Sequence, residues 1–154
     1  MKTRCLALAL IFVATSAAAQ TTYDGRIILG ETSSGEVYPD GRTRVGYTLE
    51  GTARGDLNGH FSLTLSYQPG NGGSGVTNTI VGSNWTLDLP NGQSIWGTVD
   101  GGSITWSKNG HTAGLTATLT ITGGSVSSGF GSVNGVLVQR HGTSRLRATL
   151  ALTY

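Results

Sequence analysis

The sequence contains few of the residues that signal catalysis, redox chemistry or metal binding. Its 154 residues include one cysteine, three prolines and three histidines, and only 12% are charged. The single cysteine, Cys5, lies in the N-terminal leader described below, so the rest of the chain has no disulfide and no catalytic thiol. His60, His111 and His141 are widely separated, and no G-x-S-x-G motif occurs. Neither a zinc site nor a serine nucleophile is predicted, and no cofactor or metal is expected.

Residues 1–19 have the pattern of a secretory signal peptide. A basic start precedes an apolar segment over residues 5–13, and an A-x-A cleavage site follows at residues 17–19. The apolar segment is shorter than the roughly 18 residues that a membrane-spanning helix needs. We expect the leader to be removed, residues 20–154 to form a single domain, and the protein to be secreted or periplasmic without a stable membrane span.

The net charge gives no indication of an anionic partner. Ten basic and eight acidic residues give the chain a formal net charge of +2, but Lys2 and Arg4 lie in the leader. The mature chain therefore carries eight charges of each sign. Its net charge of zero provides no argument for nucleic acid or an anionic membrane as a partner, and nucleic acid is not expected.

After the leader, apolar and polar residues alternate with the period of two that is typical of a half-buried β-strand. In the clearest segment, residues 57–67, the odd positions are mainly apolar and the even positions polar. Similar alternation occurs at residues 45–49, 85–89, 115–121 and 146–154. Turn-forming glycines with Asn, Asp or Pro separate these segments, and no window has helical periodicity. We predict an all-β domain of eight to ten short antiparallel strands, most simply a small barrel of about eight strands, with a β-sandwich as the alternative.

The first hairpin carries a possible adhesion motif. Matching the apolar faces predicts a loop that leaves Arg54 opposite His60, which places Leu49 opposite Leu65. The tripeptide Arg54-Gly55-Asp56 then lies at the loop tip, where cell-surface integrins read such a sequence. An ordinary turn is the alternative interpretation.

The tryptophans differ in the face they occupy. A turn at Gly101-Gly102 is predicted to lay Trp106 over Gly97 and to place Trp96 on the opposite, polar face. Trp85 lies on an apolar face and is assigned to the core with Trp106. Trp96 is a candidate for stacking on a sugar ring or another flat ligand, although it could instead cover a neighbouring strand.

Two acids and a threonine ladder lie close to these tryptophans in sequence. Asp88 and Asp100, near predicted strand ends, are the acidic pair that we select as candidate ligand-binding residues, with turn capping as the alternative. One strand face is lined by threonines at about 6.6 Å intervals, a spacing set by the strand period. Such a ladder could contact water, ice or sugar, or simply reflect strand propensity. It consists of Thr116, Thr118, Thr120 and Thr122.

Part of the chain resembles a known group of barrels. Residues 115–124 have the sequence LTATLTITGG and are followed by Gly129-Phe130-Gly131 and Asn134-Gly135. This succession of a Thr-rich strand, a glycine turn and a glycine-flanked phenylalanine resembles small secreted bacterial barrels that are similar to allene oxide cyclase and dirigent-like proteins. The resemblance covers about a quarter of the mature chain, and residues 125–128 depart from the usual spacing. It implies a closed eight-stranded barrel, an activity without cofactor if there is any, and a possible homo-oligomer, but no catalytic position of the family matches by motif.

Three functions remain open from the sequence. The first is an exported binding or structural module for a small molecule, a carbohydrate or a protein. The second is a cofactor-free lyase or cyclase of the allene oxide cyclase or dirigent-like type. The third is a small outer-membrane barrel, because residues 146–154 alternate up to a terminal aromatic; strands shorter than the 9 to 11 residues of spanning strands argue against it. A hollow interior with a buried carboxylate favours an enzyme, and a filled interior with an exposed Trp96 favours a binder.

Overall fold

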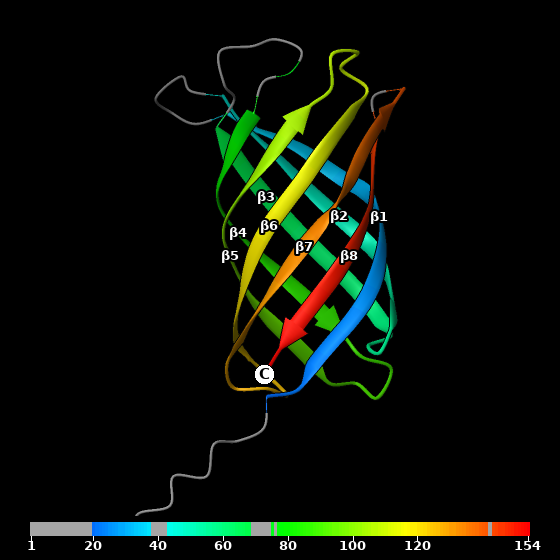
Figure 1. Ribbon diagram of the computed structural model, residues 1–154, viewed down its shortest axis with the longest axis vertical. Coiled ribbons are helices and arrows are strands. Elements are labelled where there is room, and N and C mark those ends of the chain that lie inside the picture. The colour runs from blue at the N-terminus through cyan, green and yellow to red at the C-terminus, as the bar shows by residue number, and fades with distance from the viewer. Residues whose placement is uncertain (1–19, 38–42, 69–74, 76, 142) are drawn as a thin grey trace, which may run out of the picture.

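A computed structural model describes residues 20–37, 43–68, 75, 77–141 and 143–154. They form eight antiparallel strands, each paired with the next, and the last pairs with the first to close a barrel (Figure 1). The strands are β1 (Thr22–Val37), β2 (Thr43–Gly55), β3 (Gly59–Gln68), β4 (Thr77–Asp88), β5 (Ser94–Trp106), β6 (Thr112–Gly124), β7 (Gly129–Arg140) and β8 (Thr143–Thr153). The predicted closed barrel is confirmed, and the sandwich is not formed. Closure removes the unpaired sheet edges that a cysteine-free domain would otherwise expose.

The barrel interior is filled by the apolar residues of the alternating pattern. Every strand contributes inward side chains, and many of them, such as Leu49, Leu63 and Leu119, are at most 1% exposed. Phe61 and Trp85 stack in this core with ring centroids 5.9 Å apart. Outward positions carry mainly threonine, serine, asparagine and arginine. This partition of faces is the one that the sequence alternation predicts.

The strands are longer than expected, from 10 to 16 residues. One reason is that Asp100-Gly101-Gly102, predicted as a turn, lies inside β5. The ladder with β6 shifts there, since Val99 pairs with Leu119 and Gly101 with Thr118, so Asp100 is the extra residue of a β-bulge. The bulge exchanges the two faces of β5, with Val99 buried before it and Ile104 buried after it.

This bulge corrects the predicted packing of the tryptophans. Gly97 pairs with Trp85 of β4, whose Nε1 would lie 2.9 Å from a Cβ at that glycine. An aromatic ring does cover Gly97, but it is Trp85 and not Trp106. Trp106 lies on the inner side of β5, partly buried against the core, and Trp96 lies on the outer side.

The register of the β2–β3 hairpin also differs from the prediction. Leu49 pairs with Leu63 and not with Leu65, so the predicted register was wrong by two residues, although the faces are correct. The connection between the last paired residues has the expected five residues but starts one residue earlier, at 54–58. The Asn58 side chain bridges it, accepting from the Gly55 amide at 3.4 Å and donating to the Gly55 carbonyl at 3.2 Å.

Both described chain ends lie at one end of the barrel, the lower end in Figure 1. The rings of Tyr23 and Tyr154 stack there with centroids 5.0 Å apart. Backbone hydrogen bonds of 2.7 and 3.0 Å join Thr21 to Tyr154 and complete the β1–β8 seam. The described residues contain no helix long and apolar enough to cross a membrane.

Candidate functional site

Trp96 is a large exposed aromatic residue on the outer wall of the barrel. It points outward from β5 and is 47% exposed. Its paired residue on β6 is Gly123, where an added Cβ would lie only 2.9 Å from Trp96 Cε2 and Nε1. The absence of a side chain at Gly123 therefore allows the indole to lie against the sheet. A ring held in this way offers its other face to solvent.

Asp100 lies four residues after Trp96 on β5 and is held by two threonine hydroxyls. Its Oδ1 accepts a hydrogen bond from Thr98 Oγ1 at 2.8 Å, and its Oδ2 accepts one from Thr120 Oγ1 of β6. The bulge at Asp100 aims this carboxylate outward between the two strands. An exposed carboxylate retains acceptor capacity beyond these two bonds, so it can also receive a ligand hydroxyl.

Asp88 lies on the other side of Trp96. It pairs with Ser94 across β4 and β5, and its Oδ1 accepts from Ser94 Oγ at 2.6 Å. Because six residues of extended strand separate Ser94 from Asp100, the two carboxylates are about 20 Å apart. This exceeds the separation of about 5 to 9.5 Å at which carboxylate pairs act together in glycoside hydrolysis. The three predicted residues thus share one outer face, with Trp96 between two acids.

The threonine ladder of β6 continues this surface. Its four threonines face outward, while Leu115, Ala117, Leu119 and Ile121 point into the core. On β7, Phe130 pairs with Thr120 and is 56% exposed. Phe130 is a surface aromatic that is not among the residues predicted from the sequence. Its even number could have indicated an outward position, because the inward residues Val133 and Leu137 of the same strand are odd-numbered.

The tripeptide Arg54-Gly55-Asp56 runs from the end of β2 into the turn. Gly55 has φ of +136°, and a Cβ there would lie 2.6 Å from the Asp24 carbonyl oxygen. The Asp56 amide donates to that oxygen at 3.1 Å, and Asp56 Oδ2 accepts from the Asp24 amide at 3.2 Å. Arg54 lies on the outer wall, so the carboxylate of the motif is bound to β1 while its guanidinium is exposed.

The three histidines are exposed and remain apart. His60 lies on β3 opposite Asp88, and His111 and His141 lie in turns at the end of the barrel away from the termini. In the part of the chain that the structure describes, no three His, Cys, Asp or Glu side chains gather in a way that could hold a metal ion.

The barrel interior has a polar cluster toward the same end. The Tyr67 hydroxyl donates to the Tyr47 hydroxyl at 3.5 Å, and burial, followed by this bond, raises the pKa of Tyr67. Glu31 Oε2 accepts from the Ser144 amide at 2.6 Å, just beyond the last paired residues of β1 and β8. The carboxylate thus replaces a ladder hydrogen bond at the point where β1 leaves β8.

No protein-family model, curated protein or solved structure matches this chain. Function is therefore inferred from the chemistry of the described surfaces.

Proposed function

We propose that the protein is an exported β-barrel that binds carbohydrate on the outer wall of β4 to β7, around Trp96. The observation that carries this proposal is the half-exposed indole, seated on Gly123 between Asp88 and Asp100. The apolar C–H face of a sugar ring can stack on such an indole, while carboxylates and hydroxyls bind its hydroxyl groups.

The surroundings of Trp96 favour a polyol over an apolar ligand. Thr98, Thr120 and Thr122 present hydroxyls beside the ring, and Asp100 presents a strong acceptor. Phe130 adds a second exposed aromatic beyond Thr120. This combination of separated aromatics and intervening hydroxyls fits an extended glycan that crosses several strands.

The alternatives receive less support. A lyase or cyclase would need a pocket for its substrate, whereas inward side chains from all eight strands fill the described barrel. A membrane barrel carries its apolar band outside and a polar interior, which is the inverse of the arrangement observed here. Strand length does not exclude that alternative, because the strands have 10 to 16 residues.

Export is the part of the proposal that rests on the leader. Expression of the complete chain in a Gram-negative host, followed by osmotic shock, should release a protein whose N-terminus is Gln20 by mass spectrometry. A cytoplasmic product that retains residues 1–19 would contradict export without affecting the binding surface.

The binding surface is tested with neutral polysaccharides, namely glucan, xylan, mannan and chitin oligomers, by affinity electrophoresis and tryptophan fluorescence. Removal of the stacking ring in Trp96→Ala should weaken binding by roughly tenfold or more, as for a central aromatic contact. Gly123→Ala should also weaken binding because its new methyl displaces the indole. The matched control is Gly114→Ala on the same strand, where no atom lies within 4 Å of the added Cβ.

The result also separates the possible ligands. Binding to no member of the panel, or equal binding by wild type and Trp96→Ala, would refute the carbohydrate proposal. If a protein partner is instead captured through Trp96 and no oligosaccharide competes with it, the surface serves protein binding.

A further inference from the structure

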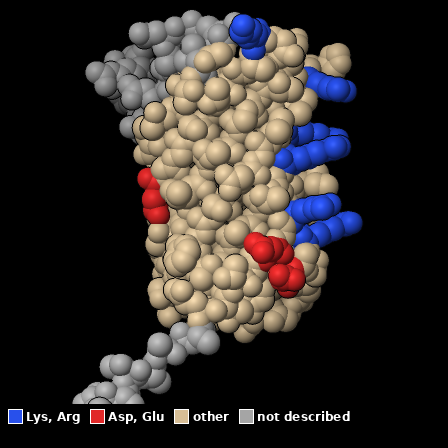
Figure 2. All heavy atoms as spheres, viewed as in Figure 1, with Lys and Arg blue, Asp and Glu red and all other residues tan. Residues whose placement is uncertain are grey.

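Five arginines gather on one side of the barrel. Arg26 on β1, Arg54 on β2, Arg140 on β7, and Arg145 and Arg147 on β8 are all exposed, and we call this surface the arginine face. Lys108 is the one other Lys or Arg side chain among those that the structure describes. Figure 2 shows basic side chains projecting as a column along this side. A net charge near zero therefore gives no sign of this cluster of five exposed arginines.

The strand register arranges these arginines in a line. Arg26 and Arg54 are directly paired, and Arg26 also pairs with Thr149 of β8. Along the outward positions of β8, Arg147 and Arg145 follow Thr149, and the next position, Thr143, pairs with Arg140. We call outward residues that pair laterally across β7, β8, β1 and β2 a row. Four successive rows each carry at least one arginine. The rows follow one another at about 6.6 Å, the two-residue repeat of a strand.

The arginines have no carboxylate partner among the side chains that the structure describes. No ion pair or hydrogen bond joins any of their guanidinium groups to another described residue. Two acids lie close to the arginines without pairing with them: Asp24 on β1 lines the same hollow as Arg26, and Glu50 on β2 shares a row with Arg145 across Gly30. Arg26 and Arg54 are like charges in directly opposed positions, an arrangement that destabilises a sheet in the absence of an anion.

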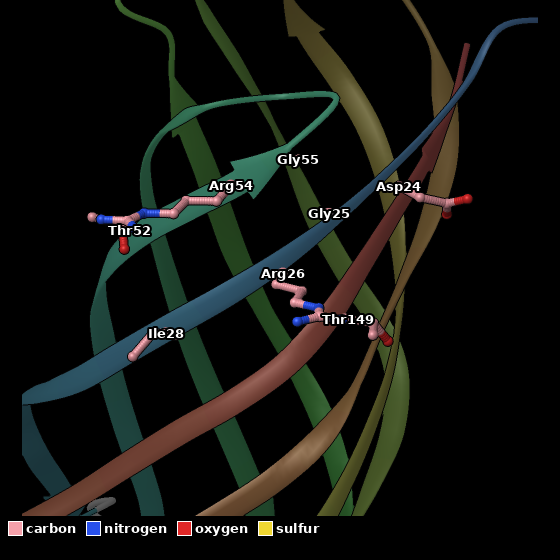
Figure 3. Close-up of a pocket in the computed structure, with 8 residues that line it drawn as sticks. All are labelled: Asp24, Gly25, Arg26, Ile28, Thr52, Arg54, Gly55 and Thr149. Carbon is pink, nitrogen blue, oxygen red and sulfur yellow. The ribbon is translucent and has the colours of Figure 1, made fainter.

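Two hollows and two aliphatic side chains accompany the charges. One hollow of about 800 Å³ lies at Arg26, Ile28 and Arg54 (Figure 3). A second of about 470 Å³ is lined by Arg140, Arg145 and Arg147, among others. Ile28 is 54% exposed and pairs with Arg147, which pairs on its other side with Val136, 48% exposed. The face therefore alternates guanidinium groups with small apolar surfaces and troughs.

We infer that the arginine face binds a linear acidic polysaccharide, a chain with carboxylate or sulfate groups at regular intervals. Guanidinium groups bind such anions through two parallel hydrogen bonds, and every described cation of the face is arginine. The linear order of the rows suits a chain that follows the barrel wall, and the troughs can accept sugar rings between the charged groups.

Other anionic partners fit this surface less well. A flat bilayer would not fill the troughs between the arginines. A single-stranded nucleic acid is usually held by stacking of its bases on aromatic side chains. The outward residues of β1, β2 and β8 that the structure describes include no aromatic side chain.

This site is separate from the surface around Trp96. The surface around Trp96 covers β4 to β7, and the arginine face covers β7, β8, β1 and β2. The two meet only on β7, where Phe130 and Arg140 lie at opposite ends of the strand. A variant on one side can therefore be measured without altering the other. The inference does not depend on whether the Trp96 surface binds carbohydrate.

The test compares binding of the mature protein to polygalacturonate, with uncharged dextran as the control polymer. The wild type should bind polygalacturonate at low ionic strength and progressively less as salt is added, because binding releases counterions. Loss of two charged hydrogen-bonding groups in the double variant Arg145→Gln, Arg147→Gln should weaken binding by about tenfold or more. Lys108→Gln removes a charge elsewhere and should leave binding within about twofold.

Several results would overturn the inference. These are no binding to polygalacturonate, binding that is equal for wild type and the double variant, or an equal loss in Lys108→Gln. Tighter arginine-dependent binding to phosphatidylglycerol vesicles or to oligo(dT) would reassign the face to a membrane or to nucleic acid. Circular dichroism melts confirm that the variants are folded, and Trp96→Ala should bind polygalacturonate like the wild type.

Discussion

Gly97→Ala tests how tightly the core is packed beneath the proposed binding surface. Gly97 is buried on β5, next to Trp96 in sequence and opposite Trp85. An added Cβ would lie 1.8 Å from the Thr120 carbonyl oxygen and 2.9 Å from Trp85 Nε1. Ordinary contact begins near 3.4 Å, so the backbone of β6 would have to move by about 1.6 Å, the difference between the two distances.

Moving Thr120 lowers the free energy of unfolding because its strand, β6, is paired on both sides. Thr120 pairs with Thr98 on one side and with Phe130 on the other. Overpacking of a core costs about 1 to 3 kcal/mol and sometimes more. Displacement of Trp85 from its stack on Phe61 adds to this cost. We expect the free energy of unfolding to fall by about 3 kcal/mol or more, out of the 5 to 15 kcal/mol that is usual for a domain.

Urea unfolding followed by circular dichroism measures this loss. Gly114→Ala is the internal control, because its added Cβ meets no atom within 4 Å. It should leave stability unchanged or raise it by about 0.4 to 1 kcal/mol through the unfolded chain. A loss below about 1 kcal/mol in Gly97→Ala, or equal losses in both variants, would refute the packing argument.

Three further outcomes are expected. Leu63→Ala should lower the free energy of unfolding by about 2 to 5 kcal/mol, because Leu63 is 0% exposed; a loss under about 1 kcal/mol in urea melts would contradict its place in the core. Arg26→Gln should raise stability by about 0.2 to 1 kcal/mol by removing repulsion from Arg54, and a destabilised variant would contradict the unpartnered charge pair. Burial and the Tyr23 hydroxyl raise the pKa of Tyr154 to about 12 from 10.0, so this group's stabilisation should be complete below pH 10 and be lost as pH rises toward 12. Tyr154→Phe should reduce this loss in urea melts at pH 9 to 11.5, and an unchanged pH dependence would contradict the shift.

The alternation of residue types predicts the faces of the strands correctly, even where the predicted turns are wrong. The predicted turn at Gly101-Gly102 exchanges the two faces, which puts Trp96 outward and Trp106 inward. The bulge at Asp100 exchanges them as well, within one continuous strand. Both devices use glycine at positive φ, and Gly102 has φ of +149°. Sequence alone does not separate them, because the difference depends on the pairing of β5 with β6 along its whole length.

The β2–β3 register shows a second limit of sequence reasoning. Both the predicted and the observed registers place apolar residues opposite apolar residues, since a shift of two preserves the faces. The choice between them is made by the Asn58 side chain, which replaces backbone hydrogen bonds at Gly55. Such a side-chain hydrogen bond contributes the energy of one hydrogen bond. It does not alter the alternation of apolar and polar residues, so the alternation cannot predict it.

The arginine face could not be predicted from composition because it depends on closure of the barrel. Arg26 and Arg147 are more than a hundred residues apart in sequence, and only the pairing of β1 with β8 brings their strands together. The net charge of the chain is insensitive to this arrangement. By contrast, Trp96, Asp88 and Asp100 lie within two neighbouring strands, so their common surface follows from local alternation.

The same pair of strands, β5 and β6, connects the core to the proposed carbohydrate surface. Inside the barrel, Trp85 packs on Gly97 of β5. Outside the barrel, Trp96, which directly precedes Gly97, packs on Gly123 of β6. Because consecutive residues of β5 point to opposite faces, an error in the inner packing moves the outer indole as well. Gly97→Ala should therefore weaken both stability and glycan binding, whereas Gly123→Ala should weaken binding with much less loss of stability. The two glycines thus distinguish a ring that is held by the core from one that is positioned only by its neighbour on the surface.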